Sequence, residues 1–483
     1  MAVQGKKHKR DRATSSNDTT STPVFRGIHT VHFVGIGGIG MSGIAEILLD
    51  QGYRVTGSDL SHSDVTDRLT TLGALVMQGH DASNIAEADV VVYSSAVDPH
   101  QNPETAEATR RKIPIIRRAE MLAEVTRMKY GVAVAGTHGK TTTTSMIGQV
   151  LIEGGVDPTV IVGGRLSGLN GANARLGHGE WTVVEADEFD RSFLSLSPTV
   201  AVITNIEREH LDIYSDLEDI RRTFAEFANK VPFYGFVTLC LDEPIVMELV
   251  PGLKRRVISY GFSPQCDLRA VDPLYEETRS RFRVERRGES LGEINLAVPG
   301  EHNVKNAMAA VTVGLELGVP FPTIAEAMGR FSGVLRRFEV KGESQGILVI
   351  DDYAHHPTEV RATLDAIRRG WKRRIVALFQ PHTYSRTRDF YEEFGKAFFN
   401  ADVVIVADIY AARERPIQGI TGELVAASAS GFGHRNVHYI PDREELATRT
   451  VALLEPGDIV VTMGAGDIWR VSDRILQLLQ HLA

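Results

Sequence analysis

The chain of 483 residues contains only two cysteines, Cys240 and Cys266, and no Cys-x-x-Cys pair. This scarcity argues against a structural zinc site or a disulfide framework and agrees with a reducing compartment. The sequence also lacks an apolar run of about 18 residues and a signal-peptide core, so we predict no membrane insertion. The net charge of −9 gives no electrostatic reason to expect nucleic acid as a partner. Together these absences predict a soluble cytoplasmic protein.

The sequence does contain a repeated alternation of short β-branched runs with helical patterns. The chain is too long to fold around a single hydrophobic core. This pattern predicts an α/β fold of three tandem domains: a Rossmann-like domain, a central P-loop ATPase-like domain and a C-terminal Rossmann-like domain. The expected segments are a disordered tail at 1–22 and domains at 23–127, 128–334 and 335–483. The expected strands are Val31–Val34, Tyr53–Thr56, Val90–Tyr93, Gly131–Ala135, Trp181–Glu185, Val200–Thr204, Ile347–Asp351, Arg374–Phe379, Asp402–Ala407 and Asp458–Met463.

A first glycine-rich loop follows the first strand, with Gly35, Gly37 and Gly40 in the spacing GxGxxG. Glycines let the backbone approach a diphosphate, and the N-terminus of the next helix supplies N–H donors. Asp59 lies 19 residues after Gly40, where a carboxylate can bind a ribose hydroxyl. The loop therefore predicts a diphosphate site, and both NAD and a sugar nucleotide fit it.

A second glycine-rich loop, Gly136-Thr137-His138-Gly139-Lys140-Thr141, follows the strand Gly131–Ala135. Lys140 is suited to the β- and γ-phosphates of ATP, and the Thr141 hydroxyl to Mg²⁺. The general P-loop pattern requires a glycine at position 134, where this chain has Val134. The strand–loop–helix context still favours a phosphate site.

Acidic residues end the strand that begins at Trp181, which is where magnesium ligands lie in P-loop enzymes. Glu185, Asp187 and Glu188 are all candidates, and chemistry alone does not choose among them. A further segment, Asn205 to Asp212, contains His210.

Gly-Thr-His-Gly-Lys-Thr-Thr-Thr from Gly136 resembles the shortened P-loop of the Mur ligases, and Met41-Ser42-Gly43-Ile44-Ala45 resembles their N-terminal domain. The resemblance covers residues 27 to 475 and implies an ATP-dependent amide ligase whose first loop holds a UDP-sugar rather than NAD. It favours Glu185 among the three acids, and His210 as ligand of a second magnesium ion.

The resemblance also implies a role for each matching residue. Those expected to contact ATP are Gly136, Thr137, His138, Gly139, Lys140, Thr141, Thr142, His302, Asn303, Asn306, Arg337 and Asp352. Those expected to contact the UDP-sugar or the amino acid are Gly35, Gly37, Gly38, Gly40, Asp59, Ser95, His355, His382 and Arg386. Thr141, Glu185 and His210 would hold two Mg²⁺ ions. The catalytic set would be Lys140, Glu185, His210, Arg337, His382 and Arg386. The structural alternative for Asn303 is a helix N-cap.

Phe224 stands where several Mur ligases have a carbamylated lysine, which favours the alanine-adding branch. That branch implies UDP-N-acetylmuramate and L-alanine as substrates, joined through an acyl phosphate, in a monomer or homodimer. Thr383 departs from the family, which often has arginine there. Candidates for a general base are His355, His356 and His382, and a pre-deprotonated amine needs none. Three alternatives remain: a ligase that attaches a whole tripeptide, an NAD-dependent oxidoreductase, and a nucleotide-binding regulator without turnover.

Overall fold

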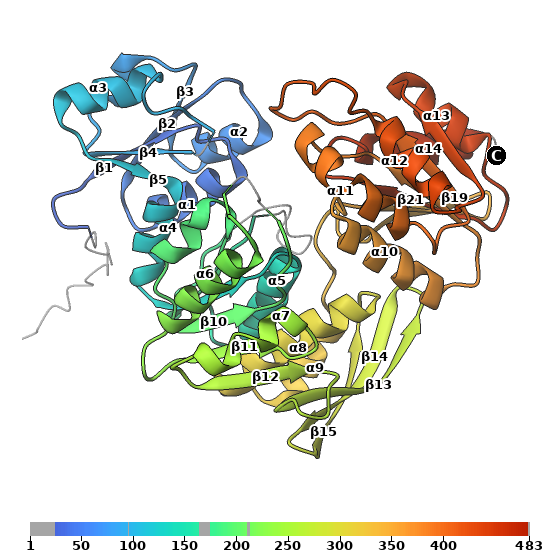
Figure 1. Cartoon of the computed structure of the whole chain (residues 1–483). Coiled ribbons are helices and arrows are strands. Elements are labelled where there is room, and N and C mark those ends of the chain that lie inside the picture. Colours follow the sequence, from blue (N-terminus) through green and yellow to red (C-terminus); the bar gives the residue numbers. More distant parts are fainter. Residues whose placement is uncertain (1–24, 95, 164–173, 210–212, 482–483) are drawn as a thin grey trace, which may run out of the picture. The chain divides into compact units, whose positions relative to one another are not determined.

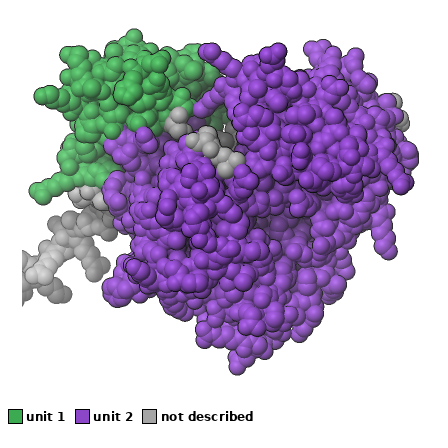
Figure 2. All heavy atoms as spheres, viewed as in Figure 1, with its two compact units in different colours: residues 1–37, 45–115 green, residues 38–44, 116–483 purple. Residues whose placement is uncertain are grey.

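The structure, a computed structural model, describes residues 25–94, 96–163, 174–209 and 213–481. These residues fall into two compact units (Figure 2). Unit 1 holds residues 25–37 and 45–115, and unit 2 holds residues 38–44 and the described chain from Ile116 onward. None of the described helices combines the length and apolar character that a membrane crossing requires.

Unit 1 contains a five-stranded sheet in the order β3-β2-β1-β4-β5. Strand β1 pairs in parallel with both β2 and β4, and the five residues of β1 are all buried. Parallel strands covered by helices need such aliphatic runs because both of their faces are buried. The bounds are β1 (Thr30–Val34), β2 (Arg54–Asp59), β3 (Leu75–Gln78), β4 (Val90–Tyr93), β5 (Ile115–Arg117), α2 (Asp64–Thr71) and α3 (Pro103–Arg111); helix α1 (Ile39–Asp50) crosses the boundary between the units.

The first part of unit 2 is built on a ten-stranded sheet in the order β15-β14-β13-β12-β11-β10-β6-β9-β7-β8 (Figure 1). Its central strands are parallel, whereas β13, β14 and β15 form an antiparallel meander. The strands are β6 (Tyr130–Ala135), β7 (Thr159–Ile161), β8 (Ala174–Arg175), β9 (Trp181–Glu185), β10 (Val200–Ile203), β11 (Phe236–Cys240), β12 (Val257–Gly261), β13 (Leu268–Glu276), β14 (Arg279–Arg286) and β15 (Glu289–Leu296). The helices are α4 (Arg118–Arg127), α5 (Lys140–Glu153), α6 (Leu217–Asn229), α7 (Pro244–Met247), α8 (Glu301–Glu316) and α9 (Phe321–Gly329).

The C-terminal part of unit 2 has a six-stranded sheet in the order β16-β17-β21-β18-β19-β20. Only β16 runs antiparallel to its neighbour, and hydrophobic clusters pack on both faces of this sheet. The strands are β16 (Glu339–Ser344), β17 (Ile347–Asp352), β18 (Ile375–Phe379), β19 (Val403–Ala407), β20 (Val437–Ile440) and β21 (Ile459–Met463). The helices are α10 (Pro357–Gly370), α11 (Tyr384–Ala397), α12 (Gly422–Gly431), α13 (Arg443–Val451) and α14 (Trp469–His481).

The structure confirms the predicted α/β class with three sheets, and every strand expected from the sequence is present, with ends that differ by at most three residues. The antiparallel meander β13–β15 was not predicted. Its strands alternate buried and exposed residues, and β14 carries four arginines in Arg-Ser-Arg-Phe-Arg-Val-Glu-Arg. A strand with one solvated face lacks the continuous aliphatic run that marked the parallel strands.

Phe224, the residue in place of the family's lysine, lies in α6 and is fully buried. Its ring packs edge-on against Phe193, with 5.1 Å between centroids. We expect Phe224→Ala to lower the free energy of unfolding by about 3–5 kcal/mol, because truncation removes buried apolar surface and leaves a cavity. Urea denaturation measures this change. The control is Phe233→Ala, since Phe233 is 92% exposed and its loss should change stability by at most about 0.5 kcal/mol. Equal effects of the two substitutions would contradict the packing role.

Candidate active site

The second glycine-rich loop joins β6 to α5 in a conformation that requires its glycines. Gly136 has φ 143° and Gly139 has φ 80°. A Cβ atom at Gly136 would lie 2.0 Å from Thr204 Oγ1, and one at Gly139 would lie 2.7 Å from Asn306 Oδ1. Gly139 is the N-cap of α5 and no side chain caps that helix end. The first N–H groups of α5 are therefore available to an anion.

Lys140, the first residue of α5, is held at this loop by hydrogen bonds. Its Nζ donates to Glu188 Oε1 and Oε2 at 2.8 and 2.7 Å, and to the Gly136 carbonyl at 2.6 Å. Burial raises the pKa of Glu188 to about 7, although the Lys140 charge opposes the shift. An arriving phosphate would compete with Glu188 for the ammonium group.

Glu185 ends β9, directly beside β6, with which it pairs at Val134. Its Oε1 accepts a hydrogen bond from the Gly163 N–H at 2.7 Å. Burial raises the pKa of Glu185, and hydrogen bonds from Gly163 and the Thr141 hydroxyl oppose that shift. Two of the three predicted magnesium ligands, Thr141 and Glu185, are therefore in contact. The third, His210, lies outside the described residues.

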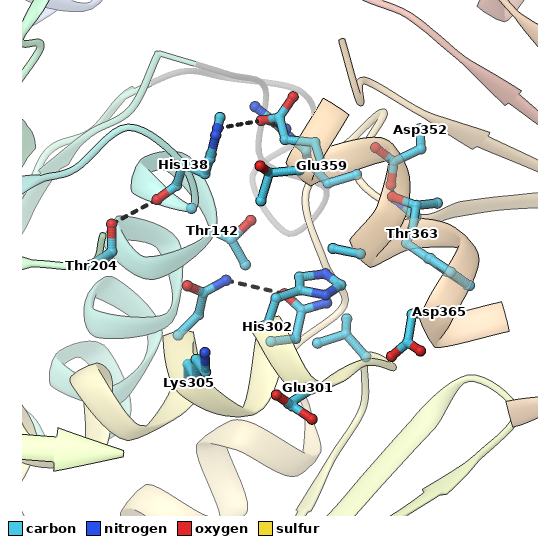
Figure 3. Close-up of a pocket in the computed structure, with 18 of the residues that line it drawn as sticks. His138, Thr142, Thr204, Glu301, His302, Lys305, Asp352, Glu359, Thr363 and Asp365 are labelled. Carbon is cyan, nitrogen blue, oxygen red and sulfur yellow. Dashed lines mark hydrogen bonds and ion pairs between the residues drawn. The ribbon is translucent and has the colours of Figure 1, made fainter. Parts of the chain in front are cut away.

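A cavity of about 470 Å³ opens beside the loop, a size suited to a nucleoside. Its lining includes eight of the residues predicted to bind ATP, namely His138, Gly139, Thr142, His302, Asn303, Asn306, Arg337 and Asp352. Figure 3 labels four of them, His138, Thr142, His302 and Asp352. The N-cap of α8 is Gly300, so the reading of Asn303 as an N-cap is wrong. The Asn303 side chain instead donates to the Pro299 carbonyl at 2.7 Å and accepts from Asn306 Nδ2 at 3.3 Å.

Asp352 is the last residue of β17 and is buried at the edge of this cavity. Its two oxygens accept backbone hydrogen bonds, from Ala354 N at 2.7 Å and from Phe338 N at 2.9 Å. Burial raises its pKa to about 6. The carboxylate thus fixes the turn after β17 as well as facing the cavity.

A second cavity, of about 970 Å³, brings the predicted phosphate and acyl-group contacts together. The sequence-predicted residues that line it are Gly40, Thr137, His138, Gly139, Lys140, Thr141, Glu185, Arg337, His355 and Arg386. His138, Gly139 and Arg337 also line the first cavity, so the two cavities adjoin.

The three histidines that were candidates for a general base are weakly basic. Burial lowers the pKa values of His355, His356 and His382 to about 4. His382 is not among the lining residues of either cavity; its Nδ1 lies 3.3 Å from Arg386 Nη1. Arg386 in turn donates to Glu209 Oε1 at 2.6 Å. Such weakly basic imidazoles are poor acceptors for the proton of an ammonium group, which favours an amine that arrives deprotonated.

Glu359 lines both cavities but was not predicted from the sequence. Its Oε1 lies 3.2 Å from His138 Nδ1 and 3.4 Å from Arg337 Nη1, and Figure 3 shows it facing His138. Burial alone would raise its pKa, but His355, His138 and Arg337 hold that pKa well below its ordinary value. One local pattern could have indicated Glu359. It is the third residue of a helix that begins at Pro357, which is the capping-box position.

In unit 1, the first glycine-rich loop is hydrogen-bonded to the carboxylate of Asp59. The Gly37 N–H donates to Asp59 Oδ2 at 2.9 Å, and Gly35 has φ 81°. Gly38 and Gly40 belong to unit 2, and Ser95 lies outside the described residues.

The resemblance places a UDP-sugar at this loop, and on that hypothesis we expect Gly37→Ala to weaken UDP-sugar binding at least tenfold, because a Cβ there would lie 2.9 Å from Asp59 Oδ2 and 3.1 Å from Thr66 Cγ2. Isothermal titration with the UDP-sugar measures the change. The control is Gly431→Ala, since a Cβ at Gly431 meets no atom within 4 Å. Unchanged affinity in Gly37→Ala would remove this loop from the sugar-nucleotide site.

Comparison with known proteins matches three family models along the chain. They are the Mur ligase family catalytic domain at residues 30–130, the Mur ligase middle domain at 134–314 and the Mur ligase glutamate ligase domain at 336–466. The chain therefore belongs to the Mur ligase family. The family assignment confirms the resemblance seen in the sequence and excludes the oxidoreductase interpretation of the first loop.

The chain is similar to alanine-adding members of this family over nearly its whole length. The UDP-N-acetylmuramate–L-alanine ligase of Salinibacter ruber is 56% identical over 460 residues, covering 95% of this chain and 97% of its own length. That of Syntrophotalea carbinolica is 54% identical, covering 94% and 99%. The crystal structure of the Thermotoga maritima UDP-N-acetylmuramate-alanine ligase has a TM-score of 0.78 at 30% identity, covering 94% of this chain and 100% of that one.

Proposed function

We propose that the chain is an ATP-dependent ligase that joins L-alanine to the lactyl carboxylate of UDP-N-acetylmuramate, a step in peptidoglycan precursor synthesis. The observation that carries this proposal is one cavity lined by Lys140, Thr141, Glu185, Arg337 and Arg386. It combines a phosphate loop, candidate metal ligands and two guanidinium groups suited to anionic substrates. Full-length identity of 52–56% to alanine ligases supports the amino-acid choice.

The reaction has two steps. A carboxylate is a poor acyl donor because its leaving group would be oxide, so the γ-phosphoryl group of ATP first passes to a lactyl oxygen, giving an acyl phosphate and ADP. The alanine ammonium group first loses one proton to solvent. The neutral amine then attacks the acyl carbon, the bond to phosphate breaks, and the nitrogen loses a second proton as the amide forms. The neutral, weakly basic state of His355 and His382 supports an amine that is already deprotonated.

The cationic side chains that line the second cavity would stabilise the negative charge of the phosphoryl group during its transfer. In the proposed complex Lys140 exchanges Glu188 for the β- and γ-phosphate oxygens, and Arg337 neutralises the transferring group. Preorganised cations in a cavity shielded from water stabilise a phosphoryl transition state more than they do in bulk solvent. Arg386, with His382 behind it, lies where it can bind a carboxylate, either of the lactyl group or of alanine.

The residues present fit magnesium ions. The Thr141 hydroxyl and the Glu185 carboxylate are oxygen donors in contact, at the mouth of a loop whose glycines leave no room for a Cβ. His210 would complete the set. When bound, magnesium neutralises charge on the phosphates.

We also propose domains at residues 23–127, 128–334 and 335–483, a proposal that the three separate sheets support. We propose a cytoplasmic location and a monomer or homodimer. A tripeptide-adding ligase remains the second candidate because it shares both glycine loops.

The test is phosphate release with ATP, UDP-N-acetylmuramate and L-alanine, each omitted in turn, and with a tripeptide in place of alanine. We expect release only with all three present, and at least tenfold higher kcat/KM for alanine than for the tripeptide. Turnover that prefers the tripeptide would assign the chain to the second candidate, and release without any amino acid would contradict amide formation.

A further inference from the structure

Three side chains of unit 2 form a cluster to which the proposed reaction assigns no chemical step. His138 of the glycine loop, Glu207 after β10 and His356 before α10 each offer one ligand atom, and these atoms lie within 4.8 Å of one another. His138 Nε2 and His356 Nδ1 lie 3.8 and 3.7 Å from Glu207 Oε2. We call these three residues the His–Glu–His cluster.

Each imidazole has one nitrogen without a hydrogen bond, and the one of His138 lies 3.8 Å from Glu207 Oε2. Among the described residues, neither His138 Nε2 nor His356 Nε2 has a hydrogen-bond partner, although both atoms are buried. The His356 side chain is only 5% exposed. Buried polar atoms are nearly always satisfied in folded proteins, so two unsatisfied ring nitrogens in one cluster point to a missing ligand.

The surroundings are those of a metal-binding histidine. His138 Nδ1 lies 3.2 Å from Glu359 Oε1, which leaves Nε2 facing Glu207. Metal-bound histidines commonly give their second nitrogen to a carboxylate in this way. Glu207 Oε2 is itself held by the Thr358 hydroxyl at 2.6 Å.

The local potential favours a cation. Burial would lower the pKa of His138, but the carboxylates of Glu359, Glu207 and Glu209 raise it to about 10. A divalent ion between the same carboxylates would take the place of the imidazolium charge.

We propose that the His–Glu–His cluster binds one divalent transition-metal ion of the Zn²⁺ class, at a site separate from the magnesium ligands Thr141 and Glu185. Two imidazoles and one carboxylate suit zinc, whereas magnesium selects oxygen ligands. Ligands at about 2.0–2.2 Å in a tetrahedral site lie about 3.4 Å apart. Binding therefore needs an inward movement of side chains whose candidate ligand atoms now lie within 4.8 Å of one another. The ion ties the glycine loop to α10.

The test is competition for ZnCl₂ between the full-length protein and a chromophoric chelator, in millimolar MgCl₂ without nucleotide. We expect one tight Zn²⁺ per chain. Glu207→Gln and His356→Asn should each weaken Zn²⁺ binding at least tenfold. Asparagine retains the capping ability that His356 supplies to α10, so this variant keeps the helix start.

Two controls separate this site from others. His178→Gln alters an exposed histidine, and Glu185→Gln alters a proposed magnesium ligand; both should retain zinc affinity within twofold. Because the assay needs no turnover, its outcome is independent of the proposed ligase activity. No zinc binding by the unaltered chain, or equal affinity in all variants, overturns the site, as does loss of binding in Glu185→Gln.

X-ray absorption of the zinc-loaded, unaltered protein gives a second measurement that does not depend on how the variants fold. We expect two imidazole ligands with Zn–N distances of about 2.0–2.1 Å. A spectrum with sulfur ligands, or with fewer than two imidazoles, excludes the His–Glu–His cluster.

Discussion

Lys140→Ala should lower kcat/KM for ADP release by about 10³-fold or more, while UDP-sugar affinity stays within about twofold. Removing one preorganised charge-stabilising group from a transition state typically costs 10²- to 10³-fold in rate. Lys140 also belongs to the loop that would position the phosphates, so we expect a loss at the upper end of that range. Coupled-enzyme detection of ADP measures the rate, and titration calorimetry measures UDP-sugar binding.

The variant also frees Glu188, whose carboxylate now accepts two hydrogen bonds from Lys140 in a buried place. Because the pKa of Glu188 is already raised to about 7, it can take a proton rather than remain an unpaired buried charge. The fold should therefore survive. Lys254→Ala, at an exposed position, is the matched control and should retain full activity. Near-normal ADP release by Lys140→Ala would show that the loop at 136–141 does not bind ATP.

Glu185→Gln should reduce kcat by about 10²- to 10³-fold and raise the Mg²⁺ concentration needed for half-maximal rate. The substitution keeps the shape and the hydrogen bond from the Gly163 N–H but removes the charge that would bind magnesium. Initial rates across a series of MgCl₂ concentrations at saturating ATP separate the two effects.

The control for Glu185→Gln is Glu180→Gln, an exposed acidic residue close in the chain. It should leave the magnesium dependence unchanged. A Glu185→Gln enzyme with ordinary magnesium dependence and reduced kcat would assign Glu185 a structural role. In that case Asp187, which lines the same cavity, would become the candidate ligand.

The sequence predicted the ligand-binding loops well because their chemistry is local. A loop such as Gly136–Thr141 needs glycines at positive φ between a strand and a helix, and these requirements are met by residues adjacent in the chain. The same holds for the buried parallel strands, whose aliphatic runs are continuous in sequence.

Partnerships between distant residues were not predictable in this way. Glu359 contacts His138, which lies 221 positions earlier in the chain, and Arg386 contacts Glu209, which lies 177 positions earlier. No spacing rule relates such pairs, since each depends on how the elements of unit 2 pack together. The role of His382 stays a prediction: it lines neither of the two cavities, but its Nδ1 lies 3.3 Å from Nη1 of Arg386, which lines the second.

The sequence by itself determined the α/β class, the two glycine loops and the acidic strand end at Glu185. These features depend on backbone conformation and burial, which residues adjacent in the chain determine. Only the tertiary structure decided that Lys140 is paired with Glu188, that Asp352 holds a turn and that His138 faces Glu207 and His356. Those contacts arise from packing of remote segments, where the burial of charged groups selects partners that no local pattern encodes.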